Sequence, residues 1–96
     1  MTPPGRGGRP CGVAFTPEAQ RQLSRLPEKL VAAVLEGLYG SIAGDPLRVS
    51  RPLHDELAGL RVARRSEYRV VFRVDESKHL IVVCRIDHRR DLYRSR

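Results

Sequence analysis

Several residue types and sequence patterns are rare or absent in this 96-residue chain, and their absence excludes some classes of protein and of binding site. There is no tryptophan, and the two cysteines, Cys11 and Cys84, form no Cys-x-x-Cys motif. Two cysteines do not make a disulfide framework, so we expect a reduced, cytoplasmic protein in which Cys84 is a small buried hydrophobic residue. No apolar run approaches the ~20 residues that cross a bilayer, so no membrane partner is expected.

The chain also lacks the spacings that metal and cofactor sites need. Its three histidines, His54, His79 and His88, lie far apart, and Asp55 and Glu56 are expected to be solvated loop charges. The N-terminal glycines precede no strand–helix unit, so no phosphate-binding glycine loop is expected. We therefore expect no metal and no cofactor.

Basic residues are abundant, and almost all of them are arginine. Lysine and arginine together number 18 against 11 acidic residues, which gives a formal charge of +7, and only two of the 18 are lysine. A small domain with this charge attracts nucleic acid or an acidic protein. The guanidinium group forks onto phosphate oxygens, although a GC-rich genome would give the same arginine bias without a functional cause.

The order of the periodic segments predicts a single domain over residues 13–96. Residues 1–12 are rich in glycine and proline, lack the apolar core of a signal peptide, and are expected to be a disordered tail. A short edge strand at residues 12–16 leads into Thr16-Pro17-Glu18, which is typical of a helix start. Two helical apolar stripes follow, separated by Pro27.

Three β-like runs complete the domain, at about residues 60–65, 67–75 and 79–86, with a turn at 75–78. Residues 48–58 show no clean period and are expected to form a loop. The two helices must bury their stripes on the sheet that follows them. The prediction is an α+β fold in which a helix hairpin packs on a three- to four-stranded antiparallel sheet, in the order β-α-α-β-β-β.

Arginines alternate with apolar residues along these runs. In the middle run, alternate residues from Tyr68 to Val74 are expected to face the core, with Arg69 and Arg73 on the opposite face. A solvated outer face would by itself explain such alternation. However, like charges on neighbouring strands repel, and an anionic ligand would explain their density. The arginines concerned are Arg61, Arg64, Arg65, Arg69, Arg73, Arg85, Arg89 and Arg90.

The stretch from His88 to Tyr93 combines groups that RNA cleavage needs. His88 can titrate near neutrality, Arg89 can hold phosphate charge, and Tyr93 can stack on a base. Taken singly, His88 is more often a surface histidine, and Tyr93 more often packs its ring on the sheet. Together they suit attack of a 2′-hydroxyl on the adjacent phosphate, a reaction that requires no metal.

Two motifs resemble the RelE/ParE superfamily of bacterial toxin–antitoxin toxins, and the RelE side of it more closely. They are R-x-x-(D/E)-Y-R-φ-φ-(F/Y) at residues 64–72 and H-R-R-(D/E)-φ-Y at residues 88–93, where φ is apolar. The resemblance extends over about residues 13–93. It implies a RelE-like fold and a type II toxin that inhibits translation as a metal-independent endoribonuclease, cleaving mRNA in the ribosomal A site. It also implies a cognate antitoxin as partner.

The resemblance implies roles for individual residues. Arg69 would contact the reacting phosphate, Arg89 would stabilise charge, and Tyr93 would position the base. Arg64 is the cation that opens the first motif, and either it or His88 would assist proton transfer; arginine holds its proton too firmly to be an easy base. Flanking RNA contacts are expected from Arg61, Arg65, Arg73, Arg85 and Arg90.

The chain departs from the family pattern at Asp87, where a glycine is common, and this difference implies an altered turn before His88. Two other functions are kept open. One is a ParE-like toxin that binds DNA gyrase without cleaving RNA, and the other is a basic RNA-binding domain without catalysis.

Overall fold

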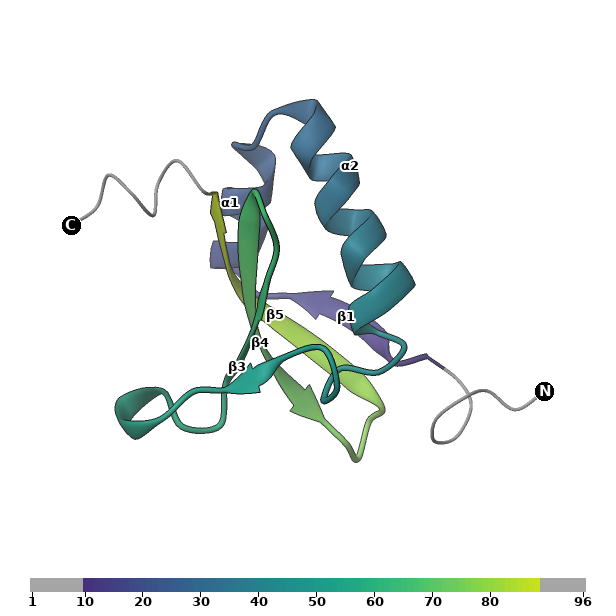
Figure 1. The fold of residues 1–96 in the computed structure, drawn as a ribbon, viewed down its shortest axis with the longest axis vertical. Coiled ribbons are helices and arrows are strands. Elements are labelled where there is room, and N and C mark those ends of the chain that lie inside the picture. The colour runs from purple at the N-terminus through teal and green to yellow at the C-terminus, as the bar shows by residue number, and fades with distance from the viewer. Residues whose placement is uncertain (1–9, 89–96) are drawn as a thin grey trace.

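Local sequence determines how the chain enters its first elements. Residues 10–88 are described by the computed structural model (Figure 1). Strand β1 (Gly12–Phe15) is followed by Thr16, whose hydroxyl accepts a hydrogen bond from the Ala19 amide at 3.1 Å and caps helix α1 (Pro17–Ser24). Pro17 fits the first helical position because no intrahelical bond needs its missing N–H. The predicted helix start is therefore confirmed.

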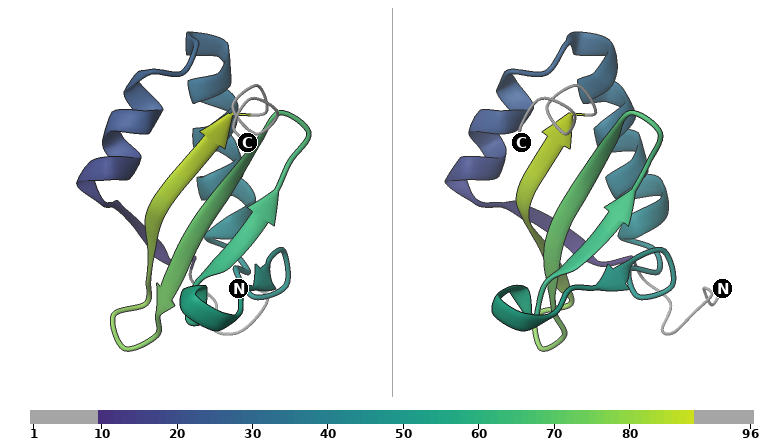
Figure 2. Two further views of the ribbon diagram at one scale, coloured as in Figure 1. Left: turned by 90° about the vertical axis from the view of Figure 1, so that its left-hand side faces the viewer. Right: turned by 60° about the vertical axis from the view of Figure 1, so that its left-hand side comes forward.

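The second helix is α2 (Glu28–Gly37), and it continues as the π-helical turn η1 (Leu38–Ile42). Its apolar stripe, with the buried Val34, Leu38 and Ile42, faces the sheet. Figure 2 shows both helices on one side of the twisted sheet. The opposite side, called the outer face below, is covered by neither α1 nor α2.

The sheet contains five strands in the order β1-β5-β4-β3-β2. After β1, these are β2 (Arg51–Pro52), β3 (Arg61–Arg64), β4 (Tyr68–Asp75) and β5 (Leu80–His88), and a 3₁₀ turn, η2 (Asp55–Leu57), follows β2. The α+β prediction is confirmed, with two differences. Strand β1 pairs parallel with β5, because the helix hairpin carries the chain across the sheet, and β2 forms within the expected loop. A two-residue strand is too short to show a sequence period.

Alternation along β4 places the core where the sequence predicts it. Val70 and Phe72 are fully buried and Tyr68 nearly so, whereas Arg73 is exposed. The β5 residues Ile81 and Val83 complete this side of the core. The core therefore lies between the helices and one sheet face, and the alternate side chains of β4 form the outer face.

A β-bulge at Cys84 reverses the alternation of β5. Val71 lies opposite Arg85, but the next residue, Phe72, lies opposite Val83, so Cys84 is the extra residue. Without this bulge, continued alternation from Val83 would place Arg85 on the core side. The bulge instead turns Arg85 and Asp87 to the outer face.

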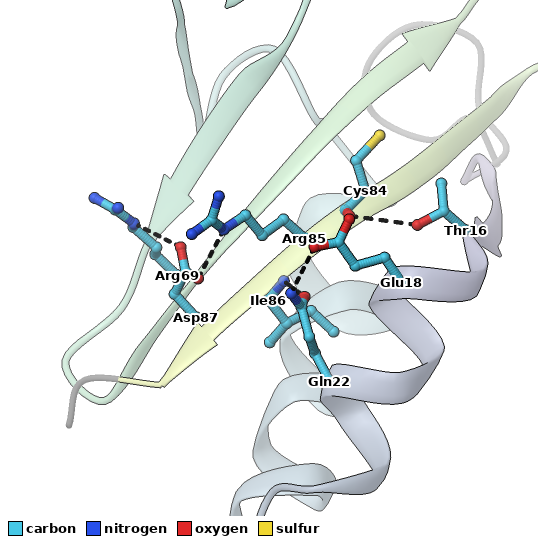
Figure 3. A network of polar contacts seen from close by, with 8 residues as sticks. All are labelled: Thr16, Glu18, Gln22, Arg69, Cys84, Arg85, Ile86 and Asp87. Carbon is cyan, nitrogen blue, oxygen red and sulfur yellow. Dashed lines mark hydrogen bonds and ion pairs between the residues drawn. The ribbon is translucent and has the colours of Figure 1, made fainter. Parts of the chain in front are cut away.

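Helix α1 secures the part of β5 that follows the bulge. The Thr16 hydroxyl donates to the Cys84 carbonyl at 3.3 Å, and the Ile86 amide donates to Gln22 Oε1 at 2.7 Å (Figure 3). These bonds replace the strand partner that β5 lacks there, because β1 pairs only with Leu80–Val83. The end of β5 is thus held by the side chains of Thr16, which caps α1, and Gln22, which lies in α1.

The predictions for the two ends of the chain fall partly outside the described residues. Gly12 lies in β1, and the Cys11 amide donates to the Ala43 carbonyl at 2.8 Å, so these two residues, which were expected in the tail, contact the rest of the fold. The expected tail at residues 1–9 lies outside the described residues. So do Arg89, Arg90 and Tyr93.

Candidate nucleic-acid interface

Two rows of side chains cross the outer face. In one row the strand register aligns Arg64, Arg69 and Asp87 on β3, β4 and β5. Arg64 and Arg69 stand directly opposite each other, a pairing of like charges that destabilises a sheet unless an anion compensates it. In the second row, Val62 and Val71 lie between Arg51 and Arg85. The face therefore offers cations around an apolar strip.

Asp87 is the anion within the first row. Its carboxylate accepts from Arg69 Nε at 3.2 Å and from Arg85 Nε at 2.9 Å, one bond to each oxygen (Figure 3). The Asp87 side chain is 9% exposed, against 35% for Arg69 and 58% for Arg85. Its hydrogen bond and charge raise the pKa of Arg85 above the ordinary value.

The geometry of this bridge leaves part of each guanidinium available. Both contacts use the Nε–H, so the terminal amino groups of Arg69 and Arg85 keep donors for another acceptor. One carboxylate against two guanidiniums also leaves a net positive charge. Asp87 thus holds two arginines in place without neutralising both.

The prediction of an altered turn before His88 is wrong, because Asp87 and His88 both lie within β5.

A groove of about 340 Å³ lies over these rows. One wall consists of leucines on and around η2, and Glu18 of α1 lines it as well. A groove with apolar walls and cationic side chains suits a nucleic-acid strand, because its bases can pack on the apolar walls and its phosphates can bind the cations. Its lining residues are Glu18, Leu53, Leu57, Leu60, Val62, Arg64, Arg69, Val71, Cys84, Arg85 and Asp87.

Two predicted RNA-binding arginines have partners away from this groove. Arg61 donates to Ser50 Oγ at 2.7 Å and to the carbonyls of Ser50 and Leu47, so it holds the loop before β2. Arg65 donates to Ser41 Oγ of η1 at 3.2 Å and lies on the helix side. These contacts give both arginines structural roles.

His88 is separated from the outer arginines. It lies opposite Tyr68, a buried residue of the core face, and both line a helix-side cavity of about 600 Å³ together with Leu30 and Arg65. Asp87, one residue earlier, faces the other way. Sequence adjacency placed His88 beside the predicted phosphate site, but strand alternation moves its side chain to the opposite face.

Comparison with known proteins identifies the family. A family model described as "ParE toxin of type II toxin-antitoxin system, parDE" matches residues 13–93. The chain belongs to the RelE/ParE toxin superfamily. It is similar to toxin RelG of Mycobacterium tuberculosis, at 46% identity over 85 residues, covering 88% of this chain and 98% of RelG. Toxin RelE of the same organism is 42% identical, covering 88% of each chain.

Solved structures of RelE/ParE toxins share the fold. The toxin–antitoxin complex RelBE2 of M. tuberculosis matches with a TM-score of 0.81 at 45% identity, covering 83% of this chain and 92% of that one. The isolated RelE toxin of Escherichia coli matches with a TM-score of 0.67 over 81% of this chain and 83% of that one. At 14% identity, the second match shows the fold alone.

Among the residues implied by the superfamily resemblance, Arg64 and Arg69 come together in the groove, and Arg85 joins them through Asp87. Arg73, opposite Val82, is exposed farther along the outer face. The sequence interpretation missed Asp87 and Glu18. Asp87 faces the groove because of the β-bulge at Cys84, and no sequence pattern predicts that bulge. Glu18 was interpreted only as part of a helix start.

Other site types find no support in residues 10–88. No group of three or more His, Cys, Asp or Glu side chains is placed there to hold a metal ion. Within the same range, no helix is long and apolar enough to cross a membrane.

Proposed function

We propose that this RelE/ParE toxin inhibits translation by cleaving mRNA in the ribosomal A site. The observation that carries the proposal is the outer groove, in which Arg64 and Arg69 face each other and Asp87 fixes Arg69. The identity of 42–46% to proteins named RelE and RelG supports the RelE branch. A single-stranded message fits an open, cationic groove with apolar walls.

The proposed chemistry is a transesterification within the RNA. The 2′-hydroxyl oxygen attacks the adjacent phosphorus, the bond from phosphorus to the 5′-oxygen of the next nucleotide breaks, and a 2′,3′-cyclic phosphate and a 5′-hydroxyl result. The 2′-hydroxyl loses one proton and the leaving oxygen gains one. Negative charge grows on the phosphoryl oxygens, and in this proposal Arg69 and Arg64 stabilise it.

Asp87 is a positioning residue in this proposal. Because it accepts from the Nε–H groups of Arg69 and Arg85, it fixes both guanidiniums before RNA arrives. His88 is left out of the direct chemistry, because its side chain lies on the helix-side face. Arg89 and Tyr93, outside the described residues, keep the roles in charge stabilisation and base positioning that the resemblance implies.

The test is primer extension on a translated message. A message incubated with active ribosomes and the toxin should show new 5′ ends within codons, and the same message without ribosomes should stay intact. Uncut message in the presence of ribosomes would exclude the nuclease proposal. Equal cutting without ribosomes would leave an RNase that does not depend on translation.

Because the family model that matches this chain describes a ParE toxin, binding to DNA gyrase is the second candidate function. Induction of the toxin separates the two. Labelled amino-acid incorporation should stop first if mRNA is the target. Gyrase-linked DNA cleavage that precedes the arrest of protein synthesis would favour the ParE-like function.

We also propose a cognate antitoxin as partner. The support is the similarity to the RelBE2 toxin–antitoxin complex. An antitoxin segment that is acidic where it contacts Arg64 and Arg69 would reduce the electrostatic repulsion between these two arginines. Its association rate should fall as salt rises, because screening weakens electrostatic steering.

A further inference from the structure

A second cationic hollow adjoins the groove at the β2 edge of the sheet. Its volume is about 390 Å³, and it contains three arginines around an apolar floor. The hollow is lined by Arg48, Val49, Ser50, Arg51, Val62 and Arg64.

The hollow and the groove are neighbours, because Val62 and Arg64 line both. The strand register explains why they lie side by side. Arg51 lies opposite Val62, Val62 opposite Val71, and Val71 opposite Arg85, so Arg51 and Arg85 end one row across four strands. With neighbouring strands ~4.8 Å apart, the row spans about 14 Å, which is longer than one nucleotide requires.

The loop that forms the hollow is held before any ligand arrives. Arg61 donates to Ser50 Oγ at 2.7 Å and to the Ser50 carbonyl at 3.2 Å, and Ser50 Oγ donates to the Pro46 carbonyl at 2.6 Å. The backbone on both sides of Arg51 is therefore fixed, by these bonds on one side and by pairing with β3 on the other. Preorganisation of this kind lowers the entropic cost of binding.

The cations of the hollow remain available to an anion. Arg51 is exposed, and no ion pair with it is found among residues 10–88. Arg48 pairs with Asp45 at 3.5 Å, but the Arg48 side chain is 77% exposed, and surface pairs of this kind contribute little. A phosphate can therefore replace Asp45 as the partner of Arg48 at small cost.

We propose that this hollow binds a phosphate of the RNA strand that flanks the reacting nucleotide, with Arg51 as the main contact and Arg48 as the second. The inference rests on the proposed function, since it extends the same bound strand from Arg69 past Arg64 to the β2 edge. Val49 and Val62 contact the sugar or base between the phosphates. RNA is favoured over an acidic protein because a strand already held at Arg64 needs only its next phosphates to reach Arg51.

The experiment measures how binding depends on RNA length and salt. Full-length toxin is titrated into fluorescent uridine oligonucleotides of increasing length, 2′-O-methylated so that they cannot be cleaved. Wild-type affinity should rise once the strand is long enough to reach Arg51. Arg51→Gln should lose that gain, and the slope of log affinity against log salt should fall by ~0.7 for each lost phosphate contact. Arg48→Gln should show a smaller change in the same direction.

Arg25→Gln is the matched control, because Arg25 is an exposed arginine at the end of α1, in the helix layer. It should retain the wild-type length dependence. Circular dichroism checks that each variant is folded, and Arg48→Gln provides a second test if Arg51→Gln is not.

Each outcome decides between the proposals. Wild-type binding that rises with length but is unchanged in Arg51→Gln and Arg48→Gln overturns the inference alone. No binding by the wild type overturns the inference alone, because primer extension on a translated message tests the proposed function separately. An Arg51 effect on RNA binding without any cleavage of translated message supports the hollow and overturns the nuclease function. If Arg51→Gln weakens binding of poly-glutamate but not of RNA, the hollow contacts an acidic protein and the inference fails.

Discussion

Arg64 and Arg65 are neighbours in the sequence, but they serve different regions of the molecule. Arg64 lies on the outer face, opposite Arg69, in a groove that leaves its charge without an acidic partner among residues 10–88. Arg65 lies on the helix side, where it donates to Ser41 of η1 and lines a cavity with Tyr68. Strand alternation, not arginine density, therefore decides which cations can meet RNA.

The two faces also differ in what stabilises them. The helix side is an apolar core of fully buried residues, such as Val34 and Phe72. The outer face depends on the bridge from Asp87 to Arg69 and Arg85, which are partly solvated. Substitutions on the helix side should therefore lower stability, and substitutions on the outer face should mainly lower activity.

The largest effect is expected for Phe72→Ala. Phe72 is fully buried between the sheet and the helices, and truncation of such a side chain costs ~3–5 kcal/mol of unfolding free energy. Urea denaturation followed by circular dichroism measures the loss. Arg73→Ala, the next residue along β4 and exposed on the outer face, is the control and should stay within ~0.5 kcal/mol of the wild type. Equal losses would contradict the division between the faces.

A smaller effect, on activity, is expected for Asp87→Asn. The amide keeps the shape of the carboxylate but loses the charge that holds Arg69 and Arg85. Misplaced guanidiniums should slow cleavage by up to ~10²-fold, the scale of a small positional error at a reacting group. Because the variant gains positive charge, its affinity for non-cleavable RNA should be unchanged or higher. Parallel losses of cleavage and affinity would instead indicate that Asp87 supports folding or binding.

For His88→Gln, cleavage should change by less than about twofold, the scale of a residue outside the reacting groups. The reason is its position beside Tyr68 in the helix-side cavity. Rates should be compared at equal folded fraction, since the helix side contributes to stability. A loss of ~10²-fold or more, typical of a general acid or base, would show that His88 reaches the substrate after all.

The smallest perturbation is alkylation of the cysteines. Cys84 lines the groove, and burial raises the pKa of its thiol above the ordinary value. Since only the thiolate reacts, alkylation at neutral pH should be slow and should accelerate as pH rises. Bound RNA should slow it further, while Cys11, near β1, should react at an unchanged rate. Mass spectrometry of the two peptides measures both rates, and equal protection of the two cysteines would count against RNA in the groove.

Much of this fold could be predicted from the sequence, because its signals are local. Thr16-Pro17 indicated a helix start, and the alternation from Tyr68 to Phe72 indicated a buried strand face; both are confirmed. The parallel pairing of β1 and the two-residue strand β2 could not be read, since both depend on tertiary contacts.

The candidate site was less predictable for the same physical reason. The motif residues Arg64 and Arg69 do come together, as the resemblance implied. The bulge at Cys84, however, changes the direction of every later side chain on β5. The bulge brings Asp87 to Arg69 and leaves His88 on the helix-side face. Regular alternation along β5 without a bulge would have predicted the opposite placement for both residues.

The most direct test of the central claim compares Arg69→Gln with Arg65→Gln in primer extension on a translated message. Both variants remove one charge from an arginine of the same motif, but only Arg69 faces the groove. Arg69→Gln should reduce cleavage by ~10²–10³-fold, as when one preorganised donor to a developing charge is removed. Arg65→Gln should cut at nearly the wild-type rate once folded protein is matched. Equal cleavage by the two variants, or a greater loss in Arg65→Gln, would contradict an RNA-cleaving site on the outer face.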